Sequence, residues 1–574
     1  METIFEKNTQ EVGQKIYYEI FYTLNQRAME DRSDFTTLII YVLYQIKRYN
    51  VKLNTTIESL VSEGIISSEV ADEINLTDEE WKSISVYADE FKKDELKYAI
   101  LFGEAPTGNK NRFIETPKSI IKLANAILNI KDDDFVADYG CAYGKFLIDA
   151  ALKSPDTSFV GYEIQKRNAL ISRIRAEILG ANMKIECKDL FSAFENDELP
   201  RFSKIFANYP FGLRMKNLFW DSKTVELMSK ECPRFSNATS LDWAFNFIVC
   251  KSLSRDGKAI AIMTNGSTFN SIDKPIRTYF IEKGLIESVI SLPSKMFNGT
   301  SVSTSMVVFS HNNESVRLIN AADICQEGRR FNEFNDSDID LIMEALNKDS
   351  EYSKSFTIEK LVDNEGALYL DRYITEKPSF ENSVAFESVI NRITRGAGLS
   401  AKELDSISSD EETEYQYLML ANIQNGIIND ELPYIKSIDN KYEKYCVKNN
   451  SLILSKNGYP YKVAVAEVEE GRTILANGNL YIIELDETKI NPIYLKAFFE
   501  SEIGIQMLKS ITVGATIPNI GIDKLKKLEI PVPPMEKQLK VANKYKATLE
   551  SIKILKERLS AELQKLNKVF EEEI

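Results

Sequence analysis

The chain has 574 residues, of which 44% are hydrophobic and 27% charged, and its formal net charge is −15. Such a chain is too long for one hydrophobic core and too apolar to be disordered, so we expect about two to four domains. The acidic balance argues only weakly against a nucleic-acid partner, because local clusters of Lys and Arg can line one groove while acidic residues solvate the remaining surface.

The cysteines and the single histidine predict neither a disulfide framework nor a metal site. The six cysteines form no CxxC pair, and His311 has no Cys or His neighbour. This pattern fits a reducing, cytoplasmic environment. The start METIFEKNTQ has no basic region followed by an apolar run, and the apolar segment TTLIIYVLYQIK is too short to span a bilayer. We therefore expect neither export nor membrane insertion.

The first part of the chain has the pattern of helices. Apolar positions recur at helical spacing in VGQKIYYEIFYTLNQRAM and in WKSISVYADEFKKDELKYAILFG. These stretches and the segments around them contain almost no glycine or proline. We predict an N-terminal helical domain over residues 1–105.

From about Asn111 the hydrophobic pattern changes to short apolar runs separated by helical stretches. The runs are DFVADYG, SFVGYEI, KIECKDLF, KIFANYP, KAIAIMTN, IESVISLP and SMVVFS. This alternation predicts a doubly wound, Rossmann-like α/β domain over residues 106–380, with a mostly parallel sheet covered by helices on both faces.

The C-terminal part changes character twice more. Residues 381–535 contain short strands and turns with an acidic loop, SISSDEETE, which predicts an α+β domain. Residues 536–574 form one charged stretch in which leucine and isoleucine fall near three-and-four spacing, the pattern of a coiled-coil-like helix. The chain is therefore predicted to be a multidomain α/β protein ending in a long helix.

A glycine-rich turn in DDDFVADYGCAYGKFLIDAA is a candidate cofactor loop. An apolar strand ends at Asp138, Gly140 and Gly144 bracket a tight turn, and an amphipathic helix follows. Glycine lets backbone approach a ligand, and the helix start offers free N–H groups. The turn lacks the GKS or GKT of a triphosphate-binding loop.

An acidic residue follows the next strand, at the end of SFVGYEI. Glu163 stands about 20 residues after the loop, where a carboxylate accepts hydrogen bonds from both hydroxyls of a ribose. Loop and acid together predict an adenosine-type cofactor. The alternative is a glycine-rich turn of an unspecialised α/β domain with a surface glutamate.

Two further polar residues each follow an apolar strand. Asp189 lies in KIECKDLF and Asn208 in KIFANYPFG. Because open α/β sheets bind ligands above the carboxyl ends of their strands, we expect both residues to face the crevice of the cofactor loop.

The ordered set DYGCAYGKFL, YEI, KDLF and NYPF resembles the amino-methyltransferases that modify N6 of adenine in DNA, and more narrowly the modification subunits of type I restriction systems. The segment NRFIETPKSIIKLA matches that family's F-x-T-P element. The resemblance covers roughly residues 101–380, and its specificity comes from the five elements in order, since NYPF alone is weak. It implies an S-adenosylmethionine cofactor. The implied cofactor residues are Phe113, Thr116, Pro117, Asp138, Gly140, Ala142, Gly144, Glu163 and Asp189.

The resemblance assigns the chemistry to Asn208, Tyr209, Pro210 and Phe211. The oxygen of Asn208 and the carbonyl of residue 209 would accept the two hydrogens of the adenine amine, and Phe211 would stack on the extruded base. Pro210 stiffens the loop. Tyr209 stands where a second proline is expected, but it keeps the carbonyl, so we predict an active site that Tyr209→Pro would leave active or improve.

A second departure from the family's pattern is Ala142, where many relatives have glycine. Alanine is tolerable there if its φ angle is negative and troublesome if φ is positive. Tyr209 and Ala142 leave open an alternative, a DNA-binding specificity or regulatory protein that keeps the fold and has weakened catalysis. Methylation of adenine in RNA, or of another planar amide nitrogen, is the alternative within the enzyme class.

The C-terminal region resembles the specificity subunits of the same systems. The resemblance rests on INRITRGAG, on NNSLILSKNGYPYKVAVAEVEEGRTILANGNLYIIELD, and on GATIPNIGIDKLKKLEIPVPPMEKQLKV before the long helix. Only one target recognition domain and one helix are present, so the chain resembles a modification subunit fused to half of a specificity subunit. The implied partners are double-stranded DNA with a flipped adenine and, in another chain, a restriction nuclease subunit.

The apolar stripe of the long helix needs a partner. Its members are Leu549, Ile552, Leu555, Leu559, Leu563 and Leu566. Either the helix folds back onto its own domains and the protein is a monomer, or two copies pair antiparallel through it as a homodimer. The sequence leaves both interpretations open.

Overall fold

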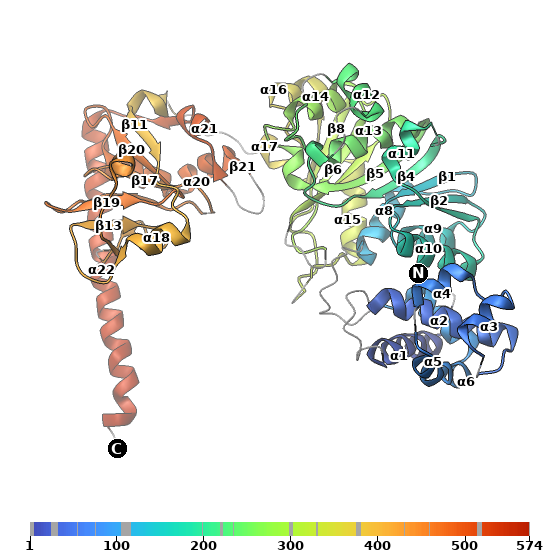
Figure 1. Ribbon diagram of the computed structural model, residues 1–574. Coiled ribbons are helices and arrows are strands. Elements are labelled where there is room, and N and C mark those ends of the chain that lie inside the picture. The colour runs from blue at the N-terminus through green and yellow to red at the C-terminus, as the bar shows by residue number, and fades with distance from the viewer. Residues whose placement is uncertain are drawn as a thin grey trace. The chain divides into compact units, whose positions relative to one another are not determined.

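The computed structural model divides the chain into two compact units, residues 1–370 and 371–574 (Figure 1). Each unit is described by itself. The residues that the structure describes are 5–23, 32–53, 55–74, 76–104, 116–197, 199–217, 222–232, 235–297, 302–328, 331–374, 380, 382–429, 431–458, 460–513 and 519–572. The four-part division at residues 105, 380 and 535 stays a prediction.

The first unit is built on a mixed sheet, nine-stranded in its described residues, with the order β3-β2-β1-β4-β5-β7-β6-β8-β9. The strands are β1 (Phe135–Tyr139), β2 (Ser158–Glu163), β3 (Met183–Cys187), β4 (Phe202–Asn208), β5 (Leu253–Thr264), β6 (Ile286–Ser291), β7 (Thr304–Phe309), β8 (Ser315–Asn320) and β9 (Ser353–Thr357). Strands β1 to β5 are parallel, and β7 runs antiparallel to β5 and β6. Each of the seven predicted apolar runs overlaps one of these strands, whereas β8 and β9 were not predicted.

Helices cover both faces of this sheet, which confirms the predicted α/β class. In Figure 1, α12, α13 and α14 lie above the sheet and α8, α9 and α15 below it. The helices of this part are α8 (Lys118–Leu128), α9 (Lys145–Lys153), α10 (Lys166–Leu179), α11 (Leu190–Glu195), α12 (Lys223–Glu231), α13 (Asp242–Ser252), α14 (Lys274–Glu282), α15 (Asp336–Asn347) and α16 (Ile358–Asp363). Buried residues of α8, α9 and α15 share one core with β1, β5 and β7.

The N-terminal residues are helical, as predicted. Their helices are α1 (Lys7–Thr23), α2 (Arg32–Tyr49), α3 (Ile57–Ser62), α4 (Ser68–Ile74), α5 (Asp78–Ser85), α6 (Tyr87–Glu90) and α7 (Lys93–Phe102). Their apolar faces share a core with Ile171 and Ile174 of α10. The buried guanidinium of Arg175 donates hydrogen bonds to the carbonyls of Ile100 (2.9 Å) and Tyr143 (3.1 Å), which ties α7 to the glycine-rich loop. Within the described residues, no helix is both long and apolar enough to cross a membrane.

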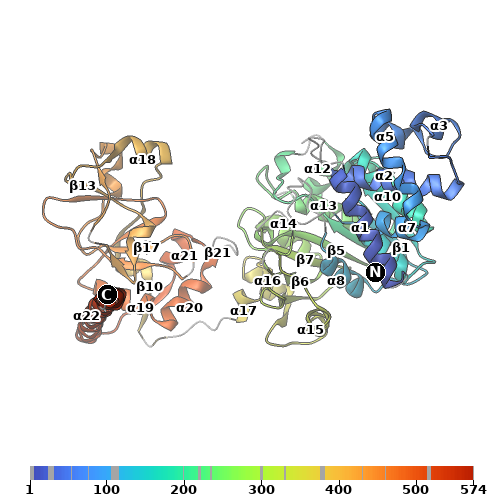
Figure 2. The ribbon, with the colours of Figure 1, turned by 90° about the horizontal axis from the view of Figure 1, so that it is seen from below.

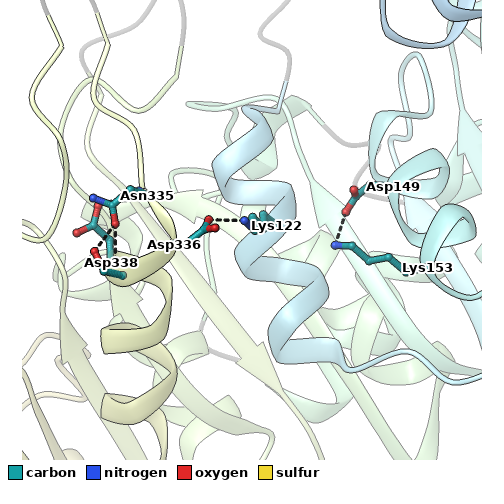
Figure 3. Close-up of polar contacts among 7 residues, drawn as sticks. Lys122, Asp149, Lys153, Asn335, Asp336 and Asp338 are labelled. Atoms are coloured by element: carbon teal, nitrogen blue, oxygen red, sulfur yellow. Dashed lines mark hydrogen bonds and ion pairs between the residues drawn. The ribbon is translucent and has the colours of Figure 1, made fainter. Parts of the chain in front are cut away.

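Helix α8 is held on two sides, and Figure 3 shows its ion pair with α15. Lys122 forms an ion pair with Asp336 at the start of α15. Asn125 donates a hydrogen bond to Asp149 of α9 at 2.6 Å, and Asp149 also pairs with Lys153 at 2.9 Å. These contacts fix the start of α8, which Thr116 and Pro117 precede, next to the loop between β1 and α9.

The second unit contains two four-stranded sheets with the orders β11-β20-β17-β18 and β12-β16-β13-β19 (Figure 2). Its strands are β10 (Ser383–Ala385), β11 (Ile390–Arg395), β12 (Ser408–Ser409), β13 (Tyr415–Leu418), β14 (Ile423–Gln424), β15 (Ile427–Ile428), β16 (Tyr434–Ile435), β17 (Leu452–Ser455), β18 (Val463–Val465), β19 (Thr473–Ala476), β20 (Leu480–Leu485), β21 (Thr512–Val513), β22 (Asn519–Ile520) and β23 (Glu529–Pro531). Its helices are α17 (Asp371–Ile374), α18 (Ala401–Ile407), α19 (Pro492–Phe499), α20 (Glu502–Ser510), α21 (Ile522–Lys526) and α22 (Met535–Glu572).

The long helix α22 packs on its own unit near its start. Gln538 donates to the carbonyl of Lys489 at 3.0 Å and Ala542 is buried in the core of this unit. Tyr545 accepts a hydrogen bond from Lys496 at 2.9 Å. Farther along, four members of the predicted apolar stripe are 42–61% exposed, namely Ile552, Leu555, Leu559 and Leu563. The helix therefore contacts its own unit through its first turns and presents a separate apolar stripe beyond them.

Candidate active site

A pocket lies at the carboxyl ends of β1 and β4, which are adjacent in the sheet. It is lined by Thr116, Asp138, Gly140, Cys141, Ala142, Tyr143, Lys145, Phe146, Phe206 and Asn208. Half of these were predicted from sequence as cofactor or catalytic residues. The parallel register explains why residues from different strands lie close together in this pocket, since Asp138 pairs with Gly161 of β2 on one side and with Phe206 of β4 on the other.

The loop between β1 and α9 takes a left-handed conformation three times. The φ angles are +78° at Gly140, +50° at Ala142 and +75° at Gly144. The condition for tolerating alanine at position 142, a negative φ, is thus not met, and an L-residue with this backbone costs about 1–2 kcal/mol relative to glycine. At Gly144 a Cβ would lie 2.4 Å from the hydroxyl of Ser172, so only glycine fits.

Two buried carboxylates flank this loop. Glu163, at the end of β2, accepts hydrogen bonds from the backbone N–H of Ala142 (2.9 Å) and of Gln165 (2.8 Å), so it holds the loop in place. Burial raises its pKa. Burial and the neighbouring charge of Glu163 raise the pKa of Asp138 well above its ordinary value. A buried pair of acids resists double ionisation, so a cationic ligand would be stabilised here.

Asn208 ends β4 and points its amide into the pocket lining. Its Nδ2 donates a hydrogen bond of 2.8 Å to the hydroxyl of Thr116. Its Oδ1 is buried and has no hydrogen-bond partner in the described part of the chain. A buried acceptor without a donor costs about 1–3 kcal/mol. Thr116 therefore fixes the orientation of the amide, and the free oxygen is available to a donor from a ligand.

The three residues after Asn208 differ in burial and in their contacts. Tyr209 is 4% exposed, and its ring stacks on Phe245 at 4.2 Å with the planes 12° apart. Its hydroxyl is buried without a partner among the described residues, and burial raises its pKa. Pro210 is exposed, and Phe211 is partly buried with its ring edge-on to Phe297 at 5.3 Å. Tyr209 thus has a packing role that the sequence did not indicate.

Two other predicted residues, Pro117 and Asp189, lie outside the described pocket lining. Pro117 immediately precedes α8, and Asp189 caps α11 by accepting a hydrogen bond from the N–H of Phe191 at 2.8 Å. Phe113 is outside the described residues. Conversely, Lys145 lines the pocket and was not predicted. Its signal in the sequence was a charged residue directly after the last glycine of the loop.

Comparison with known families assigns both parts of the chain. Residues 102–382 match the N-6 DNA Methylase family, and residues 400–565 match the type I restriction modification DNA specificity domain. The chain thus matches an N-6 DNA methylase model in one part and a type I specificity domain model in the other. The resemblance inferred from the motifs is confirmed for both parts.

Several curated relatives of the chain are methylase subunits of type I restriction enzymes. The chain is 25% identical over 300 residues to the type I restriction enzyme MjaVIII methylase subunit of Methanocaldococcus jannaschii, covering 47% of this chain and 51% of that protein. It is 22% identical over 363 residues to the MpnII methylase subunit of Mycoplasma pneumoniae, covering 58% and 66%. The chain thus spans about half of the first relative and two thirds of the second.

Solved structures share the fold. The methyltransferase subunit of a type I restriction-modification system from Streptococcus thermophilus superposes with a TM-score of 0.50 at 15% identity, covering 62% of this chain and 98% of that chain. A nuclease-deletion mutant of the Type ISP restriction-modification enzyme LlaGI, solved with a DNA substrate mimic, gives a TM-score of 0.51 at 10% identity, covering 94% and 67%. At these identities the likeness concerns the fold alone.

Proposed function

We propose that this chain is a sequence-specific DNA adenine N6-methyltransferase that uses S-adenosylmethionine. The observation that carries the proposal is the buried, unpartnered Oδ1 of Asn208, which shares a pocket with the glycine-rich loop. This oxygen lacks a hydrogen-bond donor, and the amine of an adenine base would supply one. The methylase family match agrees with this chemistry.

The pocket residues fit the proposed cofactor. S-adenosylmethionine carries a positive sulfur, which makes its methyl group electrophilic, and it carries an ammonium group as well. Asp138 and Glu163, whose raised pKa values reflect burial, would be stabilised as carboxylates by such a ligand. Glu163 uses two of about four acceptor positions on loop N–H groups, which leaves the others for ribose hydroxyls. The left-handed Gly140 keeps the backbone open to the ligand.

Asn208 would orient the target amine. Adenine N6 is a poor nucleophile because its lone pair is delocalised into the ring. Its two hydrogens would be accepted by Oδ1 of Asn208 and by the carbonyl of Tyr209, which directs the nitrogen toward the methyl group for a direct transfer. The base must leave the duplex to reach this pocket, and Phe211, three residues after Asn208, would stack on it.

The second unit would choose the site on DNA. Its family match is to DNA specificity domains. One such domain reads one short block of bases. Pairing of two chains through the exposed stripe of α22 would supply a second block and a split, palindromic site, and we extend the proposal to this homodimer. Because the matched relatives are methylase subunits of restriction enzymes, we also propose a cytoplasmic restriction-modification role with a nuclease subunit in another chain.

The alternative of a regulator with weakened catalysis rested on Tyr209 and Ala142. Tyr209 faces Phe245 rather than the pocket, and the strained Ala142 is anchored by its hydrogen bond to Glu163. Neither the tyrosine at position 209 nor the alanine at position 142 removes a functional group that the proposed chemistry of Asn208 uses. The alternative is therefore not favoured.

Transfer of tritium from labelled S-adenosylmethionine to genomic DNA lacking this modification tests the proposal. We expect label in N6-methyladenine after hydrolysis of the DNA, and none with Asn208→Ala at equal protein concentration. Sequencing of methylated DNA from cells with and without the protein would give the recognised motif. Absence of label from the wild-type protein, or label in cytosine, would refute the proposal.

A further inference from the structure

Among the described residues that line the pocket, Lys145 is the only basic one. It is the first residue of α9, directly after Gly144. Its side chain is 19% exposed, and its Nζ lies 3.1 Å from Oε1 of Glu104. The ammonium group is therefore at the pocket wall and partly withdrawn from water.

Glu104 is shared between two lysines. The Nζ of Lys118, in the first turn of α8, lies 3.5 Å from the same Oε1. Burial opposes ionisation of Glu104, but Lys145 and Lys118 outweigh it and lower its pKa. The backbone carbonyl of Glu104 accepts a hydrogen bond from Gln14 of α1 at 2.9 Å, which holds the glutamate in place. If Lys145 bound another group, Lys118 would still pair with Glu104.

The charges of the pocket match only part of the proposed cofactor. Asp138, which lines the pocket, suits its sulfonium and ammonium groups, and the adjacent Glu163 suits its ribose. The cofactor also has a carboxylate, which these acids would repel, and a desolvated carboxylate needs a positive or N–H partner. The methyl group has to approach Asn208 over β4, so the amino-acid end of the cofactor belongs on the side of Asn208 and Lys145 rather than of Glu163 on β2.

We propose that Lys145 binds the carboxylate of the cofactor, exchanging Glu104 for it, while Lys118 remains paired with Glu104. This inference rests on the proposed use of S-adenosylmethionine. The competing interpretation is an ordinary ion pair at the rim of the pocket, which contributes little to stability and nothing to binding.

Calorimetry with two ligands tests the exchange. S-adenosylmethionine and its decarboxylated analogue share the sulfonium and ammonium groups and differ in the carboxylate. For Lys145→Met we expect S-adenosylmethionine to bind roughly 10- to 100-fold more weakly, the range for a hydrogen bond between charged groups, and the analogue to bind at least as well as to the wild type. Lys118→Met, the matched control, should change neither affinity selectively.

A third variant tests the role of Glu104. Glu104→Gln removes the competitor for Lys145, so S-adenosylmethionine should bind about two- to fivefold more tightly, with the analogue unchanged. The inference is overturned if Lys145→Met affects both ligands equally or neither, if Lys118→Met shows the same selective loss, or if Glu104→Gln weakens S-adenosylmethionine. Failure of the wild-type protein to bind either ligand would instead refute the proposed function.

Discussion

The hydrogen bond between Thr116 and Asn208 makes a specific prediction about catalysis. Asn208→Ala removes the proposed acceptor of the adenine amine. Removing one preorganised hydrogen-bonding group of this kind costs about 2.7–4 kcal/mol, or roughly 10²- to 10³-fold in rate. Thr116→Val removes only the 2.8 Å bond that orients the amide. A neutral hydrogen bond contributes about 0.5–1.5 kcal/mol, so we expect a rate loss of roughly 2- to 10-fold.

The two substitutions should not be additive. If Thr116 acts through Asn208, Thr116→Val has nothing left to perturb once the amide is gone, and the double variant should match Asn208→Ala alone. Single-turnover transfer of labelled methyl to DNA measures each rate, and calorimetry measures cofactor affinity. Thr116→Ser keeps the hydroxyl and serves as the control with near wild-type rate.

One result would refute this reasoning. If Thr116→Val weakens cofactor binding and its rate loss adds in full to that of Asn208→Ala, then Thr116 is a cofactor contact, as the sequence motif predicted, and it does not hold Asn208. Unchanged cofactor affinity in all three variants, with coupled rates, supports the orienting role.

The remaining predictions concern stability and assembly. Because the folded-state pKa of Asp138 is raised, folding loses stability as pH rises above the unfolded pKa of about 3.9. Without ligand, Asp138→Asn should therefore raise the melting temperature by more at pH 8 than at pH 5, and it should weaken binding of S-adenosylmethionine. Equal shifts of the melting temperature at both pH values would contradict a destabilising Asp138 carboxylate. Tyr209→Phe deletes a buried, unpartnered hydroxyl and keeps the stack on Phe245, so the unfolding free energy should rise by about 1 kcal/mol with methylation unchanged; a loss of stability in denaturant titrations would show a hidden partner. The double variant Leu555→Lys, Leu559→Lys changes positions that are 61% and 60% exposed. It should convert a dimer to a monomer in light scattering. A wild-type protein that is already monomeric, both free and on DNA, would exclude pairing through α22.

The elements of the sheet could be predicted from sequence because their patterns are local. The seven apolar runs carry β1 to β7, since a strand buried on both faces is apolar along its length. Strand β9 lies at the edge of the sheet and reads SKSFT, while β8 reads SVRLIN. Such short and partly polar segments resemble loops until pairing defines them. The same locality applies to α22, predicted from Glu536 and observed over Met535–Glu572.

The sequence by itself determined which residue types stand at the ends of the strands, and hence the candidate cofactor loop, the acids and the NYPF segment. Only the tertiary structure decided what those side chains contact. Thr116 is hydrogen-bonded to Asn208, 92 residues away in the sequence, and Lys145 to Glu104, 41 residues away. The ring of Tyr209 is buried because it stacks on the ring of Phe245. The left-handed backbone of Ala142 likewise depends on the bond to Glu163 on the next strand. Periodicity fixes where a strand or helix forms, whereas the partner of a polar side chain depends on how distant elements pack.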